Sequence, residues 1–464
     1  MSDPELSAAS SRSRGAGWRN ALQQLYQGRL VRNILTTISG SAGAQAINLA
    51  LIPVIMRIYG PDAFGVVGTF QSLSIILIPW CALTFPMAIV LPLRDNDARG
   101  LIKLSLLMAT IICSAAAVLL YGYGAQFAGT LGIDILTPYL MLLPIVMFSS
   151  AVLEITQQWL YRNQRFSLTA RAATLHALLY NATRSLAGLV QSSAPVLMVT
   201  SALYYVIHSA LLLVGIRWQQ GSGAALVDAQ TPREPRKSLR QLAAEYRDFP
   251  VYRAPQVLIN ALSVHMPTLV LASAFGAVPA GFFALCLQVL AMPSNFIGKA
   301  VGSVYYPRIT QAIHAREPVT RLLVRGVAGM ALAGLVPFAT LAIAGPWLFG
   351  FAFGAQWQPA GEYARWLAIS EFAGFIGGPC LVAVPALALQ RGFLLFEIIS
   401  TGLRVGAVLT GAFVFMDALA VVKAFAAANV MINVSMIMIV VFEGHRWYRR
   451  QASEQPQVSV PPGF

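Results

Sequence analysis

Charged residues are scarce in this sequence of 464 residues. Only 11% are Asp, Glu, Lys or Arg, whereas 57% are hydrophobic. A soluble domain carries roughly 25% charged residues, so the composition excludes an ordinary soluble protein and is typical of a polytopic membrane protein. Most of the cations behind the formal net charge of +14 lie in the tails and in alternate loops. The charge therefore indicates orientation in a membrane, and we expect no nucleic-acid partner.

Cysteine is also rare. The four cysteines, Cys81, Cys113, Cys286 and Cys380, all fall within apolar segments. A disulfide framework needs cysteines in loops that face an oxidising compartment, so none is expected here. We also expect no cleavable signal peptide. The first thirty residues are polar and basic, and no small-residue cleavage site follows the first apolar segment.

Signals for catalysis, metal binding and nucleotide binding are missing too. No GxxxxGK[ST] motif occurs in the sequence, so nucleotide hydrolysis is not expected to drive any transport. His176, His208 and His265 are scattered over three apolar segments without ligand spacing, which argues against a metal site; proton relay is a weaker alternative. We expect no enzyme activity and no cofactor, and transport would draw on an ion gradient or the substrate gradient.

Long apolar segments dominate what is present. A span needs about 20 mostly apolar residues, and in lipid only helices and closed barrels satisfy the backbone. The segments are far too long for barrel strands, so we predict an all-α integral membrane protein with about twelve transmembrane helices. They run near 34–58, 63–91, 101–124, 134–158, 167–190, 194–217, 250–275, 279–304, 321–345, 361–388, 392–415 and 418–442.

A glycine-containing turn recurs half a chain apart. Arg57–Thr69, RIYGPDAFGVVGT, joins two apolar segments, and Phe275–Gly281, FGAVPAG, joins two more. Gly60 and Gly65 have the same spacing as Gly276 and Gly281. A hairpin that recurs in this way predicts two halves of similar design.

Lysine and arginine alternate between loops. They are concentrated in the N-terminal tail, in the loops after the second, fourth, sixth and eighth spans, and at the C-terminus; Arg57 is the exception among the other loops. The positive-inside rule then predicts that both termini and all basic loops face the cytoplasm.

The longest loop divides the chain into parallel halves with a substrate site expected between them. The predicted parts are a basic tail (1–33), a six-helix bundle (34–218), a cytoplasmic linker (219–248), a second six-helix bundle (249–443) and a C-terminal tail (444–464).

Polar side chains inside the spans are the candidate functional residues, because each is costly in lipid. Thr37, Ser41, Gln45 and Asn48 share one side of the first span, and Arg253, Gln256, Asn260 and Ser263 share one side of the seventh. Helix packing is the alternative explanation for the neutral residues. For Arg253 and Lys299 it is snorkelling to the membrane surface.

Several charges lie deeper. Arg404 is near mid-span, and Glu397 lies on the same helix side but seven residues away, too far to touch easily. We predict a cationic central cavity, with structural ion pairs as the alternative. The candidate substrate-binding residues are Arg184, Arg253, Asn260, Lys299, Arg404 and Lys423, and the candidate ion-coupling residues are Glu371, Glu397 and Glu154.

Five segments carry a family resemblance. They are RIYGPDAFG (57–65), AIVLP (88–92), FGAVPAGFFAL (275–285), PSNFIGKAVGSVYYPR (293–308) and AGEYARWLA (360–368). In order and spacing the chain resembles the polysaccharide-transport flippases, the O-antigen and exopolysaccharide translocases of the multidrug/oligosaccharidyl-lipid/polysaccharide exporter superfamily. One departure is Gly354-Ala355-Gln356 before Trp357, where the family often carries an acid.

The resemblance implies the multidrug-extrusion-like fold, with two bundles around a central cavity in a bacterial inner membrane. It implies movement of an undecaprenyl-pyrophosphate-linked oligosaccharide from the cytoplasmic to the periplasmic leaflet. The lipid-linked oligosaccharide and membrane lipids are the expected partners, with a polysaccharide polymerase and a chain-length regulator as further candidates. A cavity lined by Arg and Lys suits the pyrophosphate, since Arg binds phosphate through two parallel hydrogen bonds.

Three alternatives stay open. An ion-coupled multidrug antiporter of the same fold would be expected to carry acids in its cavity. A lipid II flippase usually has two more helices at the C-terminus. A membrane-embedded polymerase or ligase needs a large outward loop, and the outward loops here are short.

Overall fold

The computed structural model describes residues 29–221, 237–294, 305, 308–309, 311–313, 315, 317–387 and 389–453. Of residues 29–42, 219–221, 390–391, 448 and 450–453 it describes the backbone alone. Nearly all of this part of the chain is helical, and it contains no strand. The predicted all-α class is confirmed.

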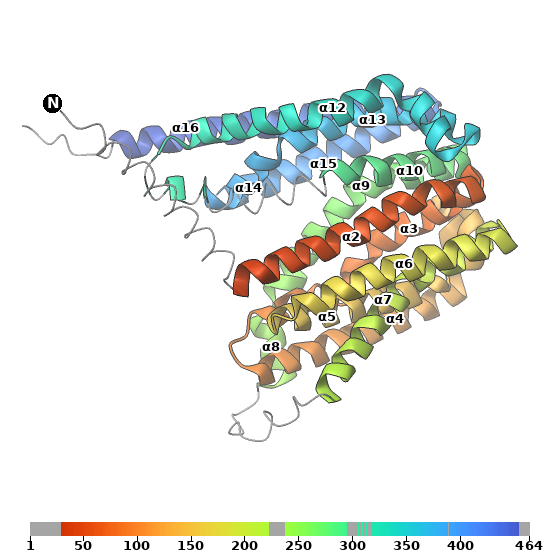
Figure 1. Ribbon diagram of the computed structural model, residues 1–464, viewed down its shortest axis with the longest axis horizontal. Coiled ribbons are helices and arrows are strands. Elements are labelled where there is room, and N and C mark those ends of the chain that lie inside the picture. The colour runs from red at the N-terminus through yellow and green to blue at the C-terminus, as the bar shows by residue number, and fades with distance from the viewer. Residues whose placement is uncertain are drawn as a thin grey trace, which may run out of the picture.

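The N-terminal half is a bundle of six long helices, drawn in red to yellow-green in Figure 1. The helices are α2 (Arg29–Ile58), α3 (Pro61–Cys81), α4 (Asp95–Leu131), α5 (Leu142–Arg162), α6 (Phe166–Val190) and α7 (Ala194–Gly221). Short helical turns η1 (Phe85–Val90) and η2 (Asp134–Tyr139) precede α4 and α5. A small helix, α8 (Leu239–Glu245), follows in the linker between the halves.

The C-terminal half occupies the other side of the molecule (Figure 1). It begins with the π-helical turn η4 (Phe249–Arg253). The helices are α9 (Ala254–Phe275), α10 (Ala277–Pro293), α12 (Val319–Phe353), α13 (Gln358–Ile376), α14 (Gly378–Ala386), α15 (Gln390–Phe413) and α16 (Ala418–Ser453), with η6 (Ala355–Trp357) before α13. Each predicted span overlaps at least one long helix, although the part of span 279–304 beyond residue 294 lies outside the described residues. Eight helices of the described chain are long and apolar enough to cross a membrane.

Three predicted spans contain a break that the sequence analysis did not anticipate. In span 63–91, α3 ends at Cys81, and Leu83 and Thr84 adopt positive φ angles of 50° and 56° before η1. Span 134–158 begins as η2, and span 361–388 is divided at Gly377. Proline removes a backbone donor and favours the first turn of a helix, and prolines accompany all three breaks: Pro86 in η1, Pro138 in η2 and Pro379 in α14.

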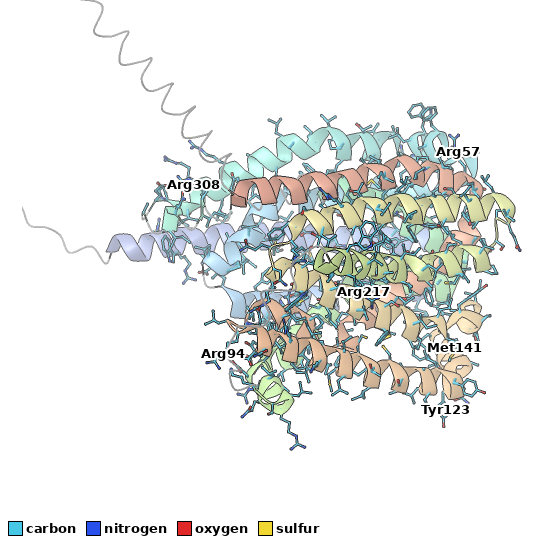
Figure 2. The ribbon with its side chains drawn as sticks, turned by 60° about the horizontal axis from the view of Figure 1, so that its bottom comes forward. Arg57, Arg94, Tyr123, Met141, Arg217 and Arg308 are labelled. Atoms are coloured by element: carbon cyan, nitrogen blue, oxygen red, sulfur yellow. The ribbon has the colours of Figure 1, made fainter. Side chains whose placement is uncertain are left out.

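The two ends of the bundle differ in charge. Arg94 and Arg308 lie toward one end of the molecule, whereas Arg57, Tyr123 and Met141 lie at the other (Figure 2). We call these the basic end and the opposite end. Successive long helices run between them, so the loops alternate between the two ends as the Lys and Arg pattern predicted.

The repeated glycine hairpins form the joint between the halves at the opposite end. Helix α3 packs against α9 and α10 of the other half. A Cβ on Gly65 would overlap the backbone carbonyl of Ala277, and a Cβ on Gly281 would overlap the carbonyl oxygen of Pro61. Because these glycines have no side chain, the backbone of each hairpin packs directly against the backbone of the other.

A tryptophan, Trp357, packs between the two halves at the opposite end of the bundle. Trp357 is fully buried, and its ring lies edge-on to Phe64 and Phe282 at centroid distances of 5.7 and 6.1 Å. Its Nε1–H donates to the carbonyl oxygen of Met56 at 2.8 Å, and Gln356 Nε2 donates to the same oxygen at 3.3 Å. This is the segment where the family pattern has an acid; a carboxylate could not donate this second hydrogen bond.

Arg57 adds a further link at this end, because its Nη2 donates to the carbonyl oxygen of Phe351 at 2.7 Å. The arginine that interrupted the loop-charge pattern therefore bonds the N-terminal half to the end of α12. Together with the contacts of Trp357 and Gln356, it holds the opposite end closed in this conformation.

The linker helix α8 lies against the basic end of the N-terminal half. Ser238 and Gln241 form a capping box at its start, and Leu242 is fully buried against Gly100 of α4. Lys237 pairs with Glu245, and the hydrogen bond between them raises the pKa of Lys237. Thr84 donates to the carbonyl oxygen of Phe249 at 3.0 Å, which ties the start of the C-terminal half to the end of α3.

The glycine joint makes a stability prediction. Gly65→Ala should lower the free energy of unfolding by about 1–3 kcal/mol, because an added methyl group in a close-packed contact forces the backbones apart. Thermal unfolding of the purified protein in detergent measures the effect. Gly122→Ala on α4 is the control, since a Cβ there has no neighbour within 4 Å. Equal stability of the two variants would contradict the close backbone contact at Gly65.

The Trp357 contact makes a conformational prediction. In Trp357→Phe/Gln356→Ala the Met56 carbonyl loses both donors while the aromatic packing remains. An unsatisfied buried carbonyl costs about 1–3 kcal/mol, so states with an open opposite end should gain about 5-fold to 150-fold in relative population. Spin labels at Tyr123→Cys and Phe415→Cys, both exposed, report the separation of the halves.

The distance distribution of that double variant should gain a longer component. Trp347→Phe is the matched control, because Trp347 is exposed and stacks on Phe351 of its own helix. An unchanged distribution in the double variant would show that these hydrogen bonds do not hold the end closed.

Candidate functional site

Arg404 is the centre of a polar cluster inside the C-terminal half. From α15, its Nη1 donates to Ser263 Oγ of α9 at 2.7 Å, and its Nε donates to Asn429 Oδ1 of α16 at 2.8 Å. The side chain is partly buried. One guanidinium thus joins three helices, which fits the five donors of Arg.

Two carboxylates face this guanidinium without contacting it. Glu371 of α13 and Glu397 of α15 both interact electrostatically with Arg404, but neither lies within 4.0 Å as an ion pair. Asn260 Nδ2 donates to Glu397 Oε1 at 3.4 Å, and Glu397 Oε2 is buried with no hydrogen-bond partner among the described residues. The expectation that Glu397 is too distant to pair directly with Arg404 agrees with this geometry.

We call Asn260, Ser263, Glu371, Glu397, Arg404 and Asn429 the Arg404 cluster. The predicted polar face of the seventh span is part of it, because Asn260 and Ser263 both point toward α15. Arg253, at the start of the same face, donates to Gln256 at 2.9 Å and is exposed near the basic end. Its position agrees with snorkelling to the membrane surface.

Arg184 forms a second site, inside the N-terminal half. It is only 6% exposed, and its guanidinium carbon lies 5.2 Å from the centroid of the Tyr180 ring. The Tyr59 hydroxyl donates to its backbone carbonyl at 3.1 Å. Nε and Nη2 are buried and have no hydrogen-bond partner in the described part of the chain. Packing on Tyr180 holds this cation in place, and its Nε and Nη2 donors are unused by the described residues.

Two of the three histidines within the predicted spans lie together, in contrast to the expectation from the sequence that they are scattered. The rings of His176 (α6) and His208 (α7) stack at 4.5 Å with an interplanar angle of 11°. His176 Nε2 lies 3.0 Å from the Tyr204 carbonyl oxygen, and its ring stacks on Tyr180. His176, Tyr180 and Arg184 are spaced four residues apart on α6, a signal that the sequence analysis missed. With Tyr204 and His208 they form what we call the Arg184 cluster.

The described residues contain no group of three His, Cys, Asp or Glu side chains suited to a metal ion. The polar face of the first span contributes to helix packing, since Asn181 of α6 donates to Asn48 Oδ1 at 2.6 Å. Thr37 and Ser41 of the same face lie where only the backbone is described.

The remaining predicted site residues are apart from both clusters. Lys423 lies 5.2 Å from the centroid of the Trp366 ring, on α16. Glu154 is half-buried on α5, with no ion pair among the described residues. Lys299 lies outside the described residues. Arg184 contacts residues of its own half, and Arg404 contacts residues of its own. That these two cations and Lys299 line one central cavity stays a prediction.

Solved structures with the same fold are membrane transporters. A multidrug resistance MATE family transporter of the MOP superfamily, in an inward-facing conformation, has a TM-score of 0.67 at 12% identity, over 87% of this chain and 94% of that one. The lipid II flippase MurJ, in an inward closed conformation, also has a TM-score of 0.67, at 9% identity over 91% and 93% of the two chains. A MOP superfamily transporter from Pyrococcus furiosus Vc1, described as having a binding pocket of reverse polarity, has a TM-score of 0.56 at 13% identity, over 91% of this chain and 95% of that one.

Among curated proteins none matches the sequence. A family model described as polysaccharide biosynthesis protein matches residues 54–362, about two thirds of the chain. The match begins just before the first glycine hairpin and ends just after Trp357, so it contains the whole joint between the halves. The chain belongs to the polysaccharide biosynthesis protein family and has the multidrug-extrusion-like fold of the MOP superfamily.

Proposed function

We propose that this protein is a flippase for a lipid-linked oligosaccharide. It moves an undecaprenyl-pyrophosphate-linked repeat unit of O-antigen or exopolysaccharide from the cytoplasmic to the periplasmic leaflet of a bacterial inner membrane. The family match supports the polysaccharide pathway. The observation that carries the proposal is the buried Arg184, because its guanidinium has donors from which no group in the described part of the chain accepts.

A buried arginine in a membrane bundle selects for an anion. A carboxyl group can take up a proton and become neutral, whereas a guanidinium stays charged. The Arg184 charge therefore needs compensation, and the phosphates of a pyrophosphate linkage supply it through charge-assisted hydrogen bonds. An organic cation, the substrate expected of a multidrug antiporter, would be repelled at this position.

The Arg404 cluster fits a coupling role in this proposal. Two carboxylates face one guanidinium. One carboxylate balances the charge of Arg404, and the other is available to take up a proton or a cation. Uptake at Glu371 would remove a negative charge that faces Arg404 and so strengthen the attraction of the guanidinium for a substrate phosphate. The cluster thus links the occupancy of a coupling ion to the affinity for an anion.

The closed opposite end supports alternating access. Contacts of Trp357, Gln356 and Arg57 with the other half close that end, and their rupture would open it. The basic end faces the cytoplasm in the proposed orientation, as the positive-inside rule requires. The halves (34–218 and 249–443) move against each other, with the linker (219–248) and both tails in the cytoplasm and a central cavity between the halves.

The role of Arg184 gives the most direct mutational test. Arg184→Gln should abolish most polysaccharide export in a strain that lacks its own flippase, because losing a charge-assisted contact in a desolvated site costs roughly 2–5 kcal/mol. Arg184→Lys should retain part of the activity, since a point charge remains. Membrane abundance is measured alongside export.

Arg217→Gln is the matched control, because Arg217 is an exposed arginine on the adjacent helix α7. Full export by Arg184→Gln at normal abundance would rule out anion binding at this residue. Loss of abundance in Arg184→Gln that Arg184→Lys also shows would assign the residue to packing on Tyr180.

The coupling role of Glu371 is tested separately. Glu371→Gln should make export insensitive to collapse of the proton and sodium gradients and reduce its rate, while binding of the lipid-linked oligosaccharide is retained. Glu362→Gln on the same helix is the control, because Glu362 forms a surface ion pair with Arg365 at 3.3 Å. Normal gradient dependence of Glu371→Gln would exclude the coupling role.

A further inference from the structure

A groove on the C-terminal half has no role in the proposed transport path. It has a volume of about 450 Å³ and lies between α13 and α16. Its lining residues are Trp366, Ile369, Lys423, Ala426, Ala427, Val430, Met431, Val434, Ser435 and Met438. Of these, only Lys423 is charged.

The groove faces away from the Arg404 cluster. Lys423, Val430, Val434 and Met438 recur at helical spacing on one side of α16. Asn429, which binds Arg404, lies about 120° around the helix from Lys423 at 100° per residue. Helix α16 runs along the edge of the molecule farthest from the N-terminal half (Figure 1). The groove therefore belongs to the outer surface that meets lipid.

Lys423 places a positive charge near the start of α16. It lies about 8 Å along the axis from Ala418, the first residue of α16, at 1.5 Å per residue. Its Nζ lies 5.2 Å from the Trp366 ring centroid, and no carboxylate of the described chain pairs with it within 4.0 Å. A cation in this region normally pairs with a counter-charge, and the aromatic face compensates it only in part.

The dimensions of the groove fit a single hydrocarbon chain. From Lys423 to Met438 it extends about 22 Å along α16. The volume of about 450 Å³ then gives a mean cross-section of about 20 Å². An α-helix, with a diameter of roughly 10–12 Å, needs about four times that area. Ala426 and Ala427 provide the depth, because their small side chains leave room against α13.

We propose that this groove binds an anionic phospholipid from the leaflet at the opposite end of the bundle. The phosphate pairs with the Lys423 ammonium, and the Trp366 indole lies beneath the headgroup as aromatic residues do near membrane interfaces. One acyl chain lies along Ala427, Val430 and Val434. Charge complementarity selects an anionic lipid over a zwitterionic one, because no acid in the lining offers a partner to a lipid ammonium group.

Native mass spectrometry of the purified, delipidated full-length protein tests the site with two probes, phosphatidylglycerol and phosphatidylethanolamine. Wild-type protein should bind phosphatidylglycerol more tightly. Lys423→Gln should lower phosphatidylglycerol affinity about fivefold, the effect expected of one lysine near a lipid surface. It should lower phosphatidylethanolamine affinity by less, because the ammonium group of that lipid already offsets its phosphate. Lys103→Gln, which removes an exposed lysine near the basic end of α4, should change neither affinity.

A groove-filling variant tests the acyl chain contact. Ala427→Trp should reduce binding of both lipids, with thermal unfolding confirming that the protein is folded; Val430→Phe serves if Ala427→Trp does not fold. Equal affinity of wild type for the two lipids, or unchanged phosphatidylglycerol affinity in Lys423→Gln, would overturn the proposal. So would a dimer that dissociates in the groove-filling variant while lipid binding is unchanged, because a second copy would then occupy the groove.

Discussion

The contact of two backbones at Gly65 and Gly281 is the constraint on which the arrangement of the halves depends. Gly65 packs against the backbone carbonyl of Ala277, and Gly281 packs against that of Pro61. Because no side chain intervenes, α3 and α10 approach closely enough for Trp357 to reach the Met56 carbonyl. The joint combines this backbone contact with a few hydrogen bonds and with the packing of Trp357 on Phe64 and Phe282. Such a joint suits halves that must separate and meet again.

The charges inside the two halves are distributed differently. In the C-terminal half, Arg404 has two hydrogen-bonded partners and two nearby carboxylates. In the N-terminal half, Arg184 has only aromatic contact and backbone support. The C-terminal cluster therefore has one more acid than base, which leaves room for a proton or cation, and the N-terminal one carries an excess positive charge. In the proposed mechanism the first responds to the coupling ion and the second holds the substrate anion.

Much of the fold follows from the sequence, because length and hydropathy determine where a helix crosses a bilayer. The paired glycines were visible as a repeat, and the polar face of Asn260 and Ser263 was visible as helical spacing. That the two glycine hairpins pack against each other was not visible, since spacing within each half carries no information on how the halves dock. The breaks after Cys81 and at Gly377 were hidden inside continuous apolar segments.

The site was predicted less completely than the fold. Helical spacing relates residues on one helix, whereas the stack of His176 on His208 depends on the register between α6 and α7. For the same reason the contact of Lys423 with Trp366 could not be predicted, because it depends on how α16 is rotated against α13. Arg404 was recognisable because mid-span depth alone implies a buried partner.

The central claim is that an anionic lipid-linked headgroup crosses the membrane through this protein. Reconstitution in liposomes with a fluorescent polyprenyl-pyrophosphate oligosaccharide measures it, by the rate at which a membrane-impermeant quencher gains access to the label. The account predicts faster exposure than in protein-free liposomes, and no competition by organic cations. Exposure no faster than in protein-free liposomes, together with gradient-driven movement of an organic cation, would contradict it.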